Sequence, residues 1–225
     1  MPRVFSRVFA AVVGAAVLAA GIGTTAVALG RYGNDISWPQ CGGAFPAKAG
    51  FGIVGVNGGR PFTQNACLSA EWQWALSNKG APAYYMNLSN PGTTDPAGYG
   101  ASAAAYALNY ASSATGASSA VSHVWWIDVE TANTWSSNQS QNVAVIQGAL
   151  TYLKQHTAKA VGVYSTGYQW GVITGGVRLG APVWAAGASS AASAPSSCGT
   201  GFTGKPVKVV QYPAGAYDGD YRCGR

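Results

Sequence analysis

Two acidic residues, Asp128 and Glu130, stand two positions apart at the end of an otherwise apolar run, residues 124–130. If this run is a β-strand, both side chains lie on one face, about 6.6 Å apart by strand rise. Two carboxyl groups that face one substrate are suited to general acid–base chemistry. The alternative is a helix cap or a solvated loop, but Asn138 or Ser136 is the better cap for the next helix. Because the chain has only seven acidic residues, the pair is predicted to be functional.

Two further acids occupy similar strand-end positions near the two ends of the chain. Asp35 lies near the end of the predicted first strand, and Asp218 follows the last clear strand. In a closed barrel the first and last strands are neighbours, so these acids could meet the first pair. Crowded carboxyl groups cannot all ionise, which raises at least one pKa and prepares a general acid. Asp220 is interpreted as a turn residue, and Glu71 and Asp95 as surface residues.

Apolar runs typical of buried strands alternate with helical patterns along most of the chain. The helix that begins at Leu68 is expected to end at Gly80, and an alanine-rich helix carries Tyr99, Tyr106 and Tyr110 on one face. Residues 187–204, rich in Ala, Ser, Pro and Gly, are predicted to form a long loop. The other strands are expected at residues 51–56, 83–88, 161–164, 182–185 and 207–212, and the other helices near 143–153 and 168–173.

This alternation predicts an α/β fold in which a parallel sheet is covered by helices. Seven or eight strands fit a TIM-like, modified β/α barrel, formed as a single domain by residues 29–225. Trp126 would then point into the barrel, whereas Trp125, Ile127 and Val129 would point outward beneath the helices. The carboxyl groups would reach the C-terminal mouth, where α/β barrels place their active sites.

The first 28 residues have the features of a secretory signal peptide. Arg3 and Arg7 precede a run of small and apolar residues, 8–22, and Ala26 and Ala28 form an A-x-A cleavage pattern. We therefore expect export, removal of residues 1–28 and a secreted, extracellular domain without membrane contact. The alternative is an uncleaved membrane anchor. The remaining basic residues are scattered singly, which argues against a nucleic-acid partner.

Four cysteines, Cys41, Cys67, Cys198 and Cys223, indicate disulfides in an exported chain. They allow three pairings, which the sequence does not distinguish; pairing the first two and the last two gives the shortest loops. The chain contains no C-x-x-C, and its two histidines are far from the cysteines, so no metal site is expected. Neither a nucleotide-binding glycine motif nor a G-x-S-x-G motif occurs, so no organic cofactor and no serine-hydrolase site are expected.

Aromatic residues stand at or near the ends of several predicted strands. Rings in such positions can stack on the faces of sugars, although most Trp and Tyr residues in a domain of this size are simply core. The candidates for substrate binding are Trp38, Tyr85, Tyr164, Trp184 and Tyr212.

An ordered set of short motifs spans most of the chain after the signal segment. Asp-Ile-Ser-x-x-Gln at 35–40, Asp-Val-Glu at 128–130, Trp-x-Ala from Trp184, and Gln211-Tyr212 followed by Asp218 resemble the motifs of the glycoside hydrolase family 25 lysozymes. The resemblance is closer to a secreted, actinobacterial-type branch of that superfamily. It implies a modified α/β barrel that cleaves the β-1,4 bond after N-acetylmuramic acid in peptidoglycan.

The resemblance also implies roles for individual residues. Glu130 would protonate the leaving glycosidic oxygen, and Asp128 would act as nucleophile or orient the substrate acetamido group. Asp35 and Asp218 would position and tune that pair, and Gln211 would bind substrate. The chain departs from the family pattern in having a cysteine after Gln40 and in ending with Asp-Gly-Asp rather than Asp-x-Asn.

The partner that the resemblance implies is cell-wall glycan, bound by a monomer. A barrel that binds this glycan without cleaving it, and a glycosidase that acts on another polysaccharide, are the alternatives.

Overall fold

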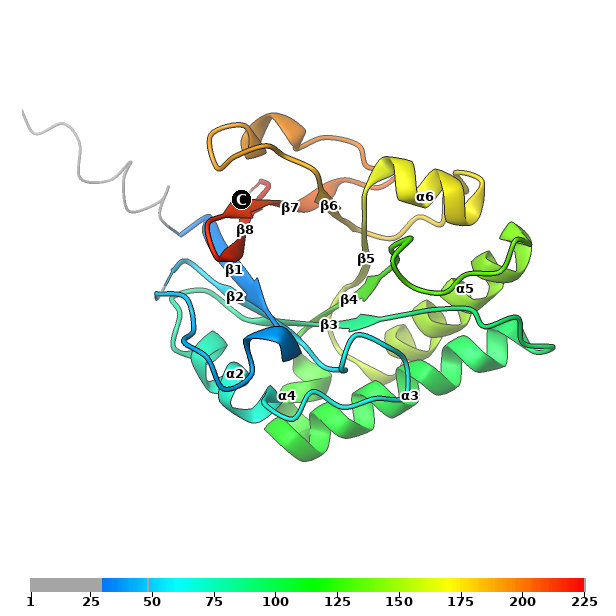
Figure 1. Cartoon of the computed structure of the whole chain (residues 1–225), viewed down its shortest axis with the longest axis horizontal. Helices are drawn as coiled ribbons and strands as arrows, with labels where there is room; N and C mark the ends of the chain where they lie inside the picture. The colour runs from blue at the N-terminus through cyan, green and yellow to red at the C-terminus, as the bar shows by residue number, and fades with distance from the viewer. Residues whose placement is uncertain (1–29, 48, 225) are drawn as a thin grey trace, which may run out of the picture.

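The computed structural model describes residues 30–47 and 49–224, which form one closed eight-stranded barrel (Figure 1). The predicted signal peptide, residues 1–28, lies outside the described residues. Within the described part of the chain, no helix is both long and apolar enough to cross a membrane. The expected single α/β barrel is confirmed.

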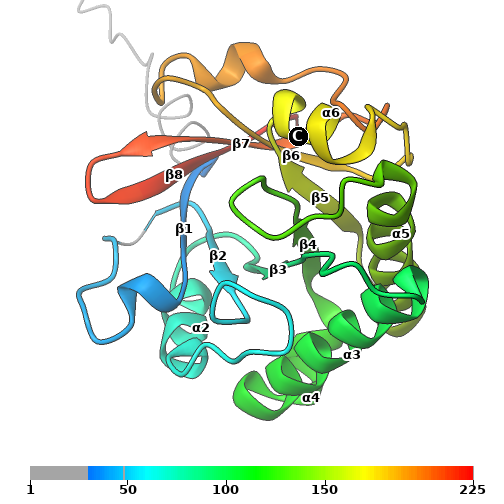
Figure 2. The same ribbon diagram turned by 45° about the vertical axis from the view of Figure 1, so that its right-hand side comes forward.

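The strands follow one another around the barrel in chain order. Neighbours from β1 to β7 pair in parallel, whereas β8 pairs antiparallel with both β7 and β1. The predicted parallel sheet is thus confirmed for β1 to β7, and β8 is an additional strand that the sequence did not predict. It is antiparallel because the short β7–β8 turn leaves no room for a crossover helix. Figure 2 shows this hairpin projecting from the barrel. The strands are β1 (Tyr32–Ile36), β2 (Gly52–Gly55), β3 (Ala83–Asn87), β4 (Val124–Asp128), β5 (Val161–Ser165), β6 (Val183–Ala186), β7 (Val207–Ala214) and β8 (Tyr217–Arg222).

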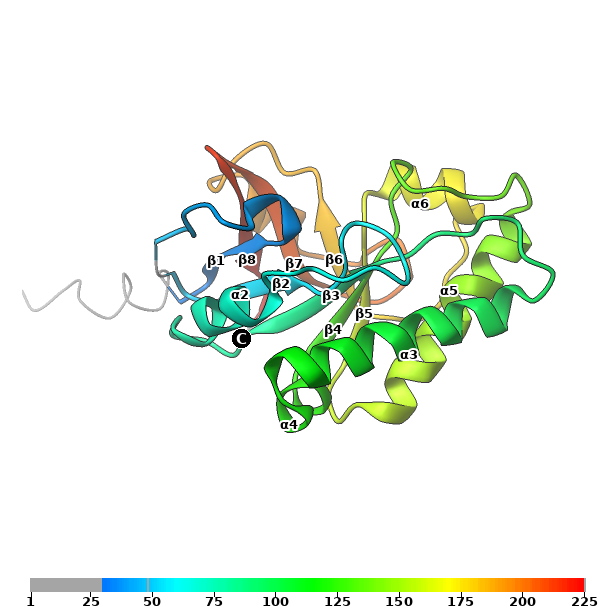
Figure 3. The ribbon, with the colours of Figure 1, turned by 60° about the horizontal axis from the view of Figure 1, so that its bottom comes forward.

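Helices cover only part of the barrel. Figure 3 shows α3, α4 and α5 lying along one side of the strands. Between β6 and β7 no α-helix occurs; this segment contains only a short 3-10 helix, η2, in the predicted long loop. The helices are η1 (Trp38–Gln40), α2 (Leu68–Leu76), α3 (Pro96–Thr115), α4 (Ala117–Ser122), α5 (Gln139–His156), α6 (Gly167–Thr174) and η2 (Ala194–Ser197).

The alanine-rich helix α3 packs on α5 through its small residues, and not through its tyrosines. A Cβ atom added to Gly100 would lie 1.9 Å from the backbone oxygen of Val145, so the two helices approach very closely there. The predicted tyrosine face instead lies beside this contact, where Tyr99 and Tyr106 pack edge-on against Phe62 (ring centroids 5.4 and 5.8 Å). Small residues allow the close approach, and the bulky rings are left at its margin.

Helix α2 ends at Leu76, capped by Ser77, rather than at Gly80 as predicted. Glu71 lies in the same helix and is fully buried, so the prediction that it is a surface residue is wrong. The Asn65 side chain donates to Glu71 Oε2 at 2.7 Å and to the Gly55 carbonyl at 2.8 Å. Burial raises the pKa of Glu71 to about 7, and the hydrogen bond from Asn65 partly opposes this effect.

Asp95, the other acid that was predicted to lie at the surface, is exposed. Its side chain accepts a hydrogen bond from the Gly98 backbone N–H at 3.0 Å and so caps α3. Asn138 caps α5 in the same way, by accepting from the Gln141 backbone. This leaves the acids at the end of β4 free of a capping role.

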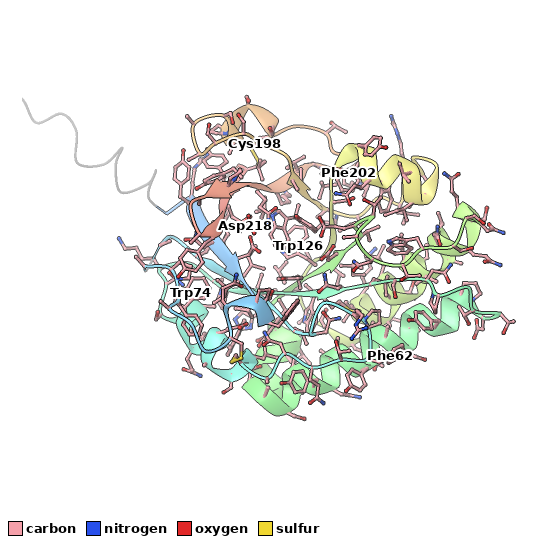
Figure 4. All side chains as sticks on the ribbon, in the orientation of Figure 1. Phe62, Trp74, Trp126, Cys198, Phe202 and Asp218 are labelled. Atoms are coloured by element: carbon pink, nitrogen blue, oxygen red, sulfur yellow. A yellow bond between two sulfur atoms is a disulfide. The ribbon has the colours of Figure 1, made fainter. Side chains whose placement is uncertain are left out.

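The two faces of β4 divide as expected. Trp125, Ile127 and Val129 are buried in the layer between strands and helices, whereas Trp126 belongs to a separate cluster inside the barrel. Figure 4 labels Trp126 within the ring of strands. Asp128, which has the same parity as Trp126, must therefore also face the interior.

The predicted disulfides are confirmed, and the pairing is the one that gives the shortest loops. Cys41–Cys67 joins the segment after η1 to the start of α2, and Cys198–Cys223 joins the segment after η2 to the end of β8. The first bridge joins two segments outside the strands, and the second ties the β6–β7 segment to the end of β8.

Candidate active site

Polar side chains gather at the end of the barrel formed by the C-terminal ends of the parallel strands. The register sets them at similar levels on neighbouring strands, because inward-facing residues of paired strands lie side by side. Asp218 lies on the inner side of this ring in Figure 4. The Cα partners around the mouth are Asn87 and Asp128, Asp128 and Tyr164, Gln211 and Asp220, and Asp35 and Asp218.

Asp128 is buried at the end of β4, with 4% of its surface exposed. Its Oδ2 accepts a hydrogen bond from the Asn87 side-chain amide. Asn87 is itself held by Asn57, whose side chain accepts from the Asn87 N–H at 3.1 Å and donates to its carbonyl at 2.9 Å. Among the described residues Asp128 Oδ1 has no hydrogen-bond partner. One oxygen is thus fixed by the protein, and the other is buried without a hydrogen-bond partner.

The pKa of Asp128 is raised well above its ordinary value, mainly by burial and then by the nearby Glu130 and Asp35 carboxyl groups. Nothing in the sequence set Asn87 apart from any other residue at a strand end. Its role as the partner of Asp128 follows only from the pairing of β3 with β4.

Glu130 lies two residues beyond the end of β4, which is shorter than the predicted strand, and its side chain is half-buried. Its backbone carbonyl accepts hydrogen bonds from the Trp135 indole N–H at 2.7 Å and from the Asn133 backbone N–H at 3.1 Å. Burial raises the pKa of Glu130, while the side chains of Gln169 and Tyr164 partly oppose this effect. Glu130 is thus a carboxyl group that keeps its proton more readily than a solvated one and still reaches solvent.

A chain of hydrogen bonds crosses the mouth from β5 to β1. The Tyr164 hydroxyl donates to Gln211 Oε1 at 2.7 Å, and Gln211 Nε2 donates to Asp35 Oδ2 at 3.0 Å. Burial raises the pKa of Asp35 to about 7, against the opposing effect of the Gln211 hydrogen bond, and Asp218 raises it further. Asp218 itself is exposed at the rim, and partial burial raises its pKa as well.

Asp220 is a buried member of this acid cluster, and its interpretation as a turn residue is wrong. It lies in β8 and is fully buried, and its Oδ1 accepts a hydrogen bond from the Trp184 indole N–H at 2.8 Å. Burial, followed by the Asp35 carboxyl, raises its pKa well above the ordinary value. The Asp-Gly-Asp sequence is typical of a turn, and only pairing with β7 and β1 makes it a strand.

The predicted aromatic residues occupy three kinds of position. Trp184 and Tyr164 pack together inside the barrel (ring centroids 4.5 Å) and form the floor beneath the carboxyl groups. Tyr85 is partly buried beside Trp184, and Trp38 is 51% exposed at the rim. Tyr212 does not reach the mouth: strand alternation turns it outward, while Gln211 points inward. Its prediction as a substrate-binding residue is therefore wrong.

A further exposed ring at the mouth was not singled out from the sequence. Tyr168, in the first turn of α6 directly after β5, is 80% exposed. In the order of strands around the barrel, β5 lies opposite β1, after which Trp38 is placed. The two exposed rings thus stand on opposite sides of the mouth.

The acid cluster predicts an unusual dependence of stability on pH. Six of the seven acidic residues have raised pKa values in the folded protein. Such groups bind protons more readily when folded, so their stabilising effect is complete below their unfolded pKa near 4 and is lost as the pH rises through the folded values. The free energy of unfolding should therefore fall by about 2 kcal/mol or more between pH 4 and pH 7.

Urea denaturation at the two pH values measures this change. A Glu71→Gln variant removes a carboxyl group whose pKa is raised and which lies outside the mouth. Its free energy of unfolding should therefore differ less between pH 4 and pH 7 than that of the wild-type protein. A free energy of unfolding that rises from pH 4 to pH 7 would contradict the assigned directions.

Fold and site together define an α/β-barrel protein with a carboxylate cluster at its C-terminal mouth. The chain matches the family described as "Lysozyme-like protein 1" over residues 77–197. Since this match covers more than half of the chain, the protein belongs to that lysozyme-like family, and the predicted resemblance to the family 25 lysozymes is confirmed.

Individual relatives agree with this assignment. "Probable GH family 25 lysozyme 4" of Dictyostelium discoideum is 34% identical over 101 residues, which cover 44% of this chain and 44% of that protein. The alignment therefore spans less than half the length of this curated relative.

Solved structures show the same fold. A family GH25 lysozyme from Aspergillus fumigatus has a TM-score of 0.62 at 16% identity, covering 87% of this chain and 94% of the other. The bacterial lysozyme from Streptomyces coelicolor has a TM-score of 0.58 at 18% identity, covering 86% and 92%. At such low identity these similarities establish the barrel fold alone.

Proposed function

We propose that this protein is a secreted, muramidase-like glycoside hydrolase that cleaves β-1,4 bonds of peptidoglycan. The observation that carries the proposal is the Asp128–Glu130 pair. Asn87 fixes one oxygen of Asp128 and leaves the other without a partner, and the half-buried Glu130 with its raised pKa stands two residues further on. An oriented acceptor beside a proton donor is the pair of groups that glycoside cleavage requires.

The proposed reaction uses both carboxyl groups. Glu130 donates its proton to the glycosidic oxygen as the bond from that oxygen to the sugar carbon breaks, so the leaving sugar departs as a neutral alcohol. Asp128 Oδ1 accepts a hydrogen bond from the N–H of the substrate acetamido group, whose carbonyl oxygen then attacks the sugar carbon. Glu130, now ionised, takes a proton from water, and the resulting hydroxide opens the intermediate to give a new reducing end.

The rest of the mouth would support this pair. The hydrogen bonds from Tyr164 through Gln211 to Asp35 fix the side-chain orientation of these residues beside the catalytic carboxyls. The Asp35 carboxyl further raises the pKa of Asp128. Because neighbouring carboxylates repel one another, some of the carboxyl groups in the cluster keep their protons. Trp38 at the rim and Tyr85 within the mouth are the side chains proposed to contact sugar rings.

The similar proteins support the choice of substrate. Two of the similar solved structures are muramidases, from Trichobolus zukalii and Acremonium alcalophilum. Another is the autolysin LytC of Streptococcus pneumoniae in complex with a synthetic peptidoglycan ligand, of which this chain covers 46%. The family match and these relatives favour a glycan that contains N-acetylmuramic acid as the substrate.

Secretion is part of the proposal. The leader at residues 1–28 has the composition of a cleaved signal peptide, and the barrel domain would then comprise residues 29–225. The two disulfides suit an oxidising compartment outside the cell.

The test is the release of new reducing ends from purified peptidoglycan and from chitin oligomers, measured side by side. We expect release from peptidoglycan and little or none from chitin, because chitin lacks the lactyl group of N-acetylmuramic acid. Equal release from both would contradict the muramidase assignment. Binding to peptidoglycan without any release would contradict hydrolysis and favour a glycan-binding barrel.

A further inference from the structure

A cavity opens at the end of the barrel opposite the carboxylate mouth. It has a volume of about 390 Å³, in the range of small-ligand pockets. Its wall includes residues at or just before the N-terminal ends of the parallel strands: Phe51 before β2, Ala83 of β3 and Val124 of β4. The Asp128–Glu130 pair lies at and beyond the other end of β4, whereas Asp220 lies between the two ends of the barrel and partly opposes the effect of burial on the pKa of Arg222.

The inner wall of this cavity is apolar. Phe51, Ile53, Trp126 and Val209 contribute buried side chains to it. Barrels of this class normally fill their interior with layers of bulky side chains. Here the inward position at the start of β3 holds only Ala83, which leaves space beside it in the lowest layer. The Trp126 ring packs over Gly162 of β5.

The rim of the cavity is cationic. Lys159, Lys208 and Arg222 line it, and none of the described lining residues is acidic. The Arg222 guanidinium lies over the Phe51 ring, 3.9 Å from its centroid, and its Nη2 donates to the Ala81 carbonyl. Arg222 is thus held in place at the boundary between the apolar wall and solvent.

Lys208 is placed at this rim by an irregularity in the sheet. The register between β6 and β7 passes from Val183 opposite Val207 to Trp184 opposite Val209, so Lys208 is an extra residue in β7. A bulge of this kind changes the direction of the side chain that it carries. Lys208 and Lys159, which lies in the loop before β5, thus bring two exposed ammonium groups to one opening.

We propose that this cavity is a binding site for a small anionic amphiphile, a carboxylate attached to a single alkyl chain. The alkyl chain would occupy the apolar interior beside Phe51 and Trp126, and the carboxylate would remain at the rim with Lys208, Lys159 and Arg222. Charge complementarity selects an anion, and the depth of the apolar wall selects an alkyl body over a simple inorganic ion.

The test uses ω-bromoundecanoate, whose bromine quenches tryptophan fluorescence at short range, with ω-bromoundecanol as its uncharged counterpart. We expect saturable quenching by the carboxylate that a Trp126→Phe variant largely loses. The alcohol should bind about tenfold more weakly. No saturable quenching, equal affinity for the alcohol, or unchanged quenching in Trp126→Phe would each overturn the proposal.

Charge variants locate the anion. Lys208→Glu should weaken binding of the carboxylate about tenfold, and Lys208→Ala, which adds no opposite charge, should weaken it less. The matched control is Arg60→Glu, an equal change of charge at an exposed residue of the β2–α2 loop on the mouth side. Circular dichroism checks that each variant is folded. An equal loss of affinity in Arg60→Glu and Lys208→Glu would show a general charge effect and overturn the proposal.

Discussion

A Glu130→Gln variant is expected to release reducing ends from peptidoglycan about 10² to 10⁴ times more slowly than the wild-type protein. Glutamine keeps the size of the side chain and its backbone contacts to Trp135 and Asn133, but it has no acidic proton to transfer. The leaving sugar would then depart as an alkoxide, which is far less favourable. The rate of reducing-end release at saturating substrate measures this effect.

Glu71→Gln is the matched control for this variant. Glu71 is also a carboxyl group with a raised pKa, but it lies on the buried face of α2, outside the mouth. The same substitution there should leave the rate of cleavage within about threefold of wild type, provided the variant is folded under the assay conditions. Equal rates in Glu130→Gln and wild type would refute the assignment of Glu130 as the proton donor.

An Asp128→Asn variant is expected to lose a factor of about 10² to 10³ in the same rate. Asn87 already donates to one oxygen of Asp128, and the free oxygen carries the charge that would orient the substrate acetamido group. An amide has the same shape but no negative charge, and it can present a donor to the acetamido N–H. The loss should appear mainly in kcat, since the charge acts on the developing intermediate.

An Asn87→Ala variant tests how much the orientation of the Asp128 side chain contributes to the rate, because it leaves the Asp128 carboxyl group in place. The carboxyl group remains, but it loses the hydrogen bond that fixes its orientation, so we expect a smaller loss of about tenfold and a shift of the pH–rate profile. The direction of that shift is set by the hydrogen bond: an amide donor favours the ionised form, so its removal moves the profile to higher pH. A larger loss in Asn87→Ala than in Asp128→Asn would contradict these roles.

Much of the fold could be predicted because its signals are local. Each predicted strand and helix between residues 51 and 212 corresponds to an element of the structure, since apolar runs and helical spacing depend on neighbours in the chain. The inward direction of Trp126 and Asp128 followed from alternation along one strand. The errors lie where local signals are weak or misleading. Asp-Gly-Asp suggests a turn, although β8 is a strand, and an isolated glutamate suggests a surface, although Glu71 is buried.

The sequence by itself determined the alternation of elements, the cysteine count and the Asp128–Glu130 pair, because these depend on composition and spacing alone. Only the tertiary structure decided which side chains share the mouth, since closure of the barrel joins residues far apart in the chain. The hydrogen bonds from Asn87 to Asp128, from Trp184 to Asp220 and from Gln211 to Asp35 are contacts of this kind. Their burial together, away from water, is what raises the pKa values of the cluster.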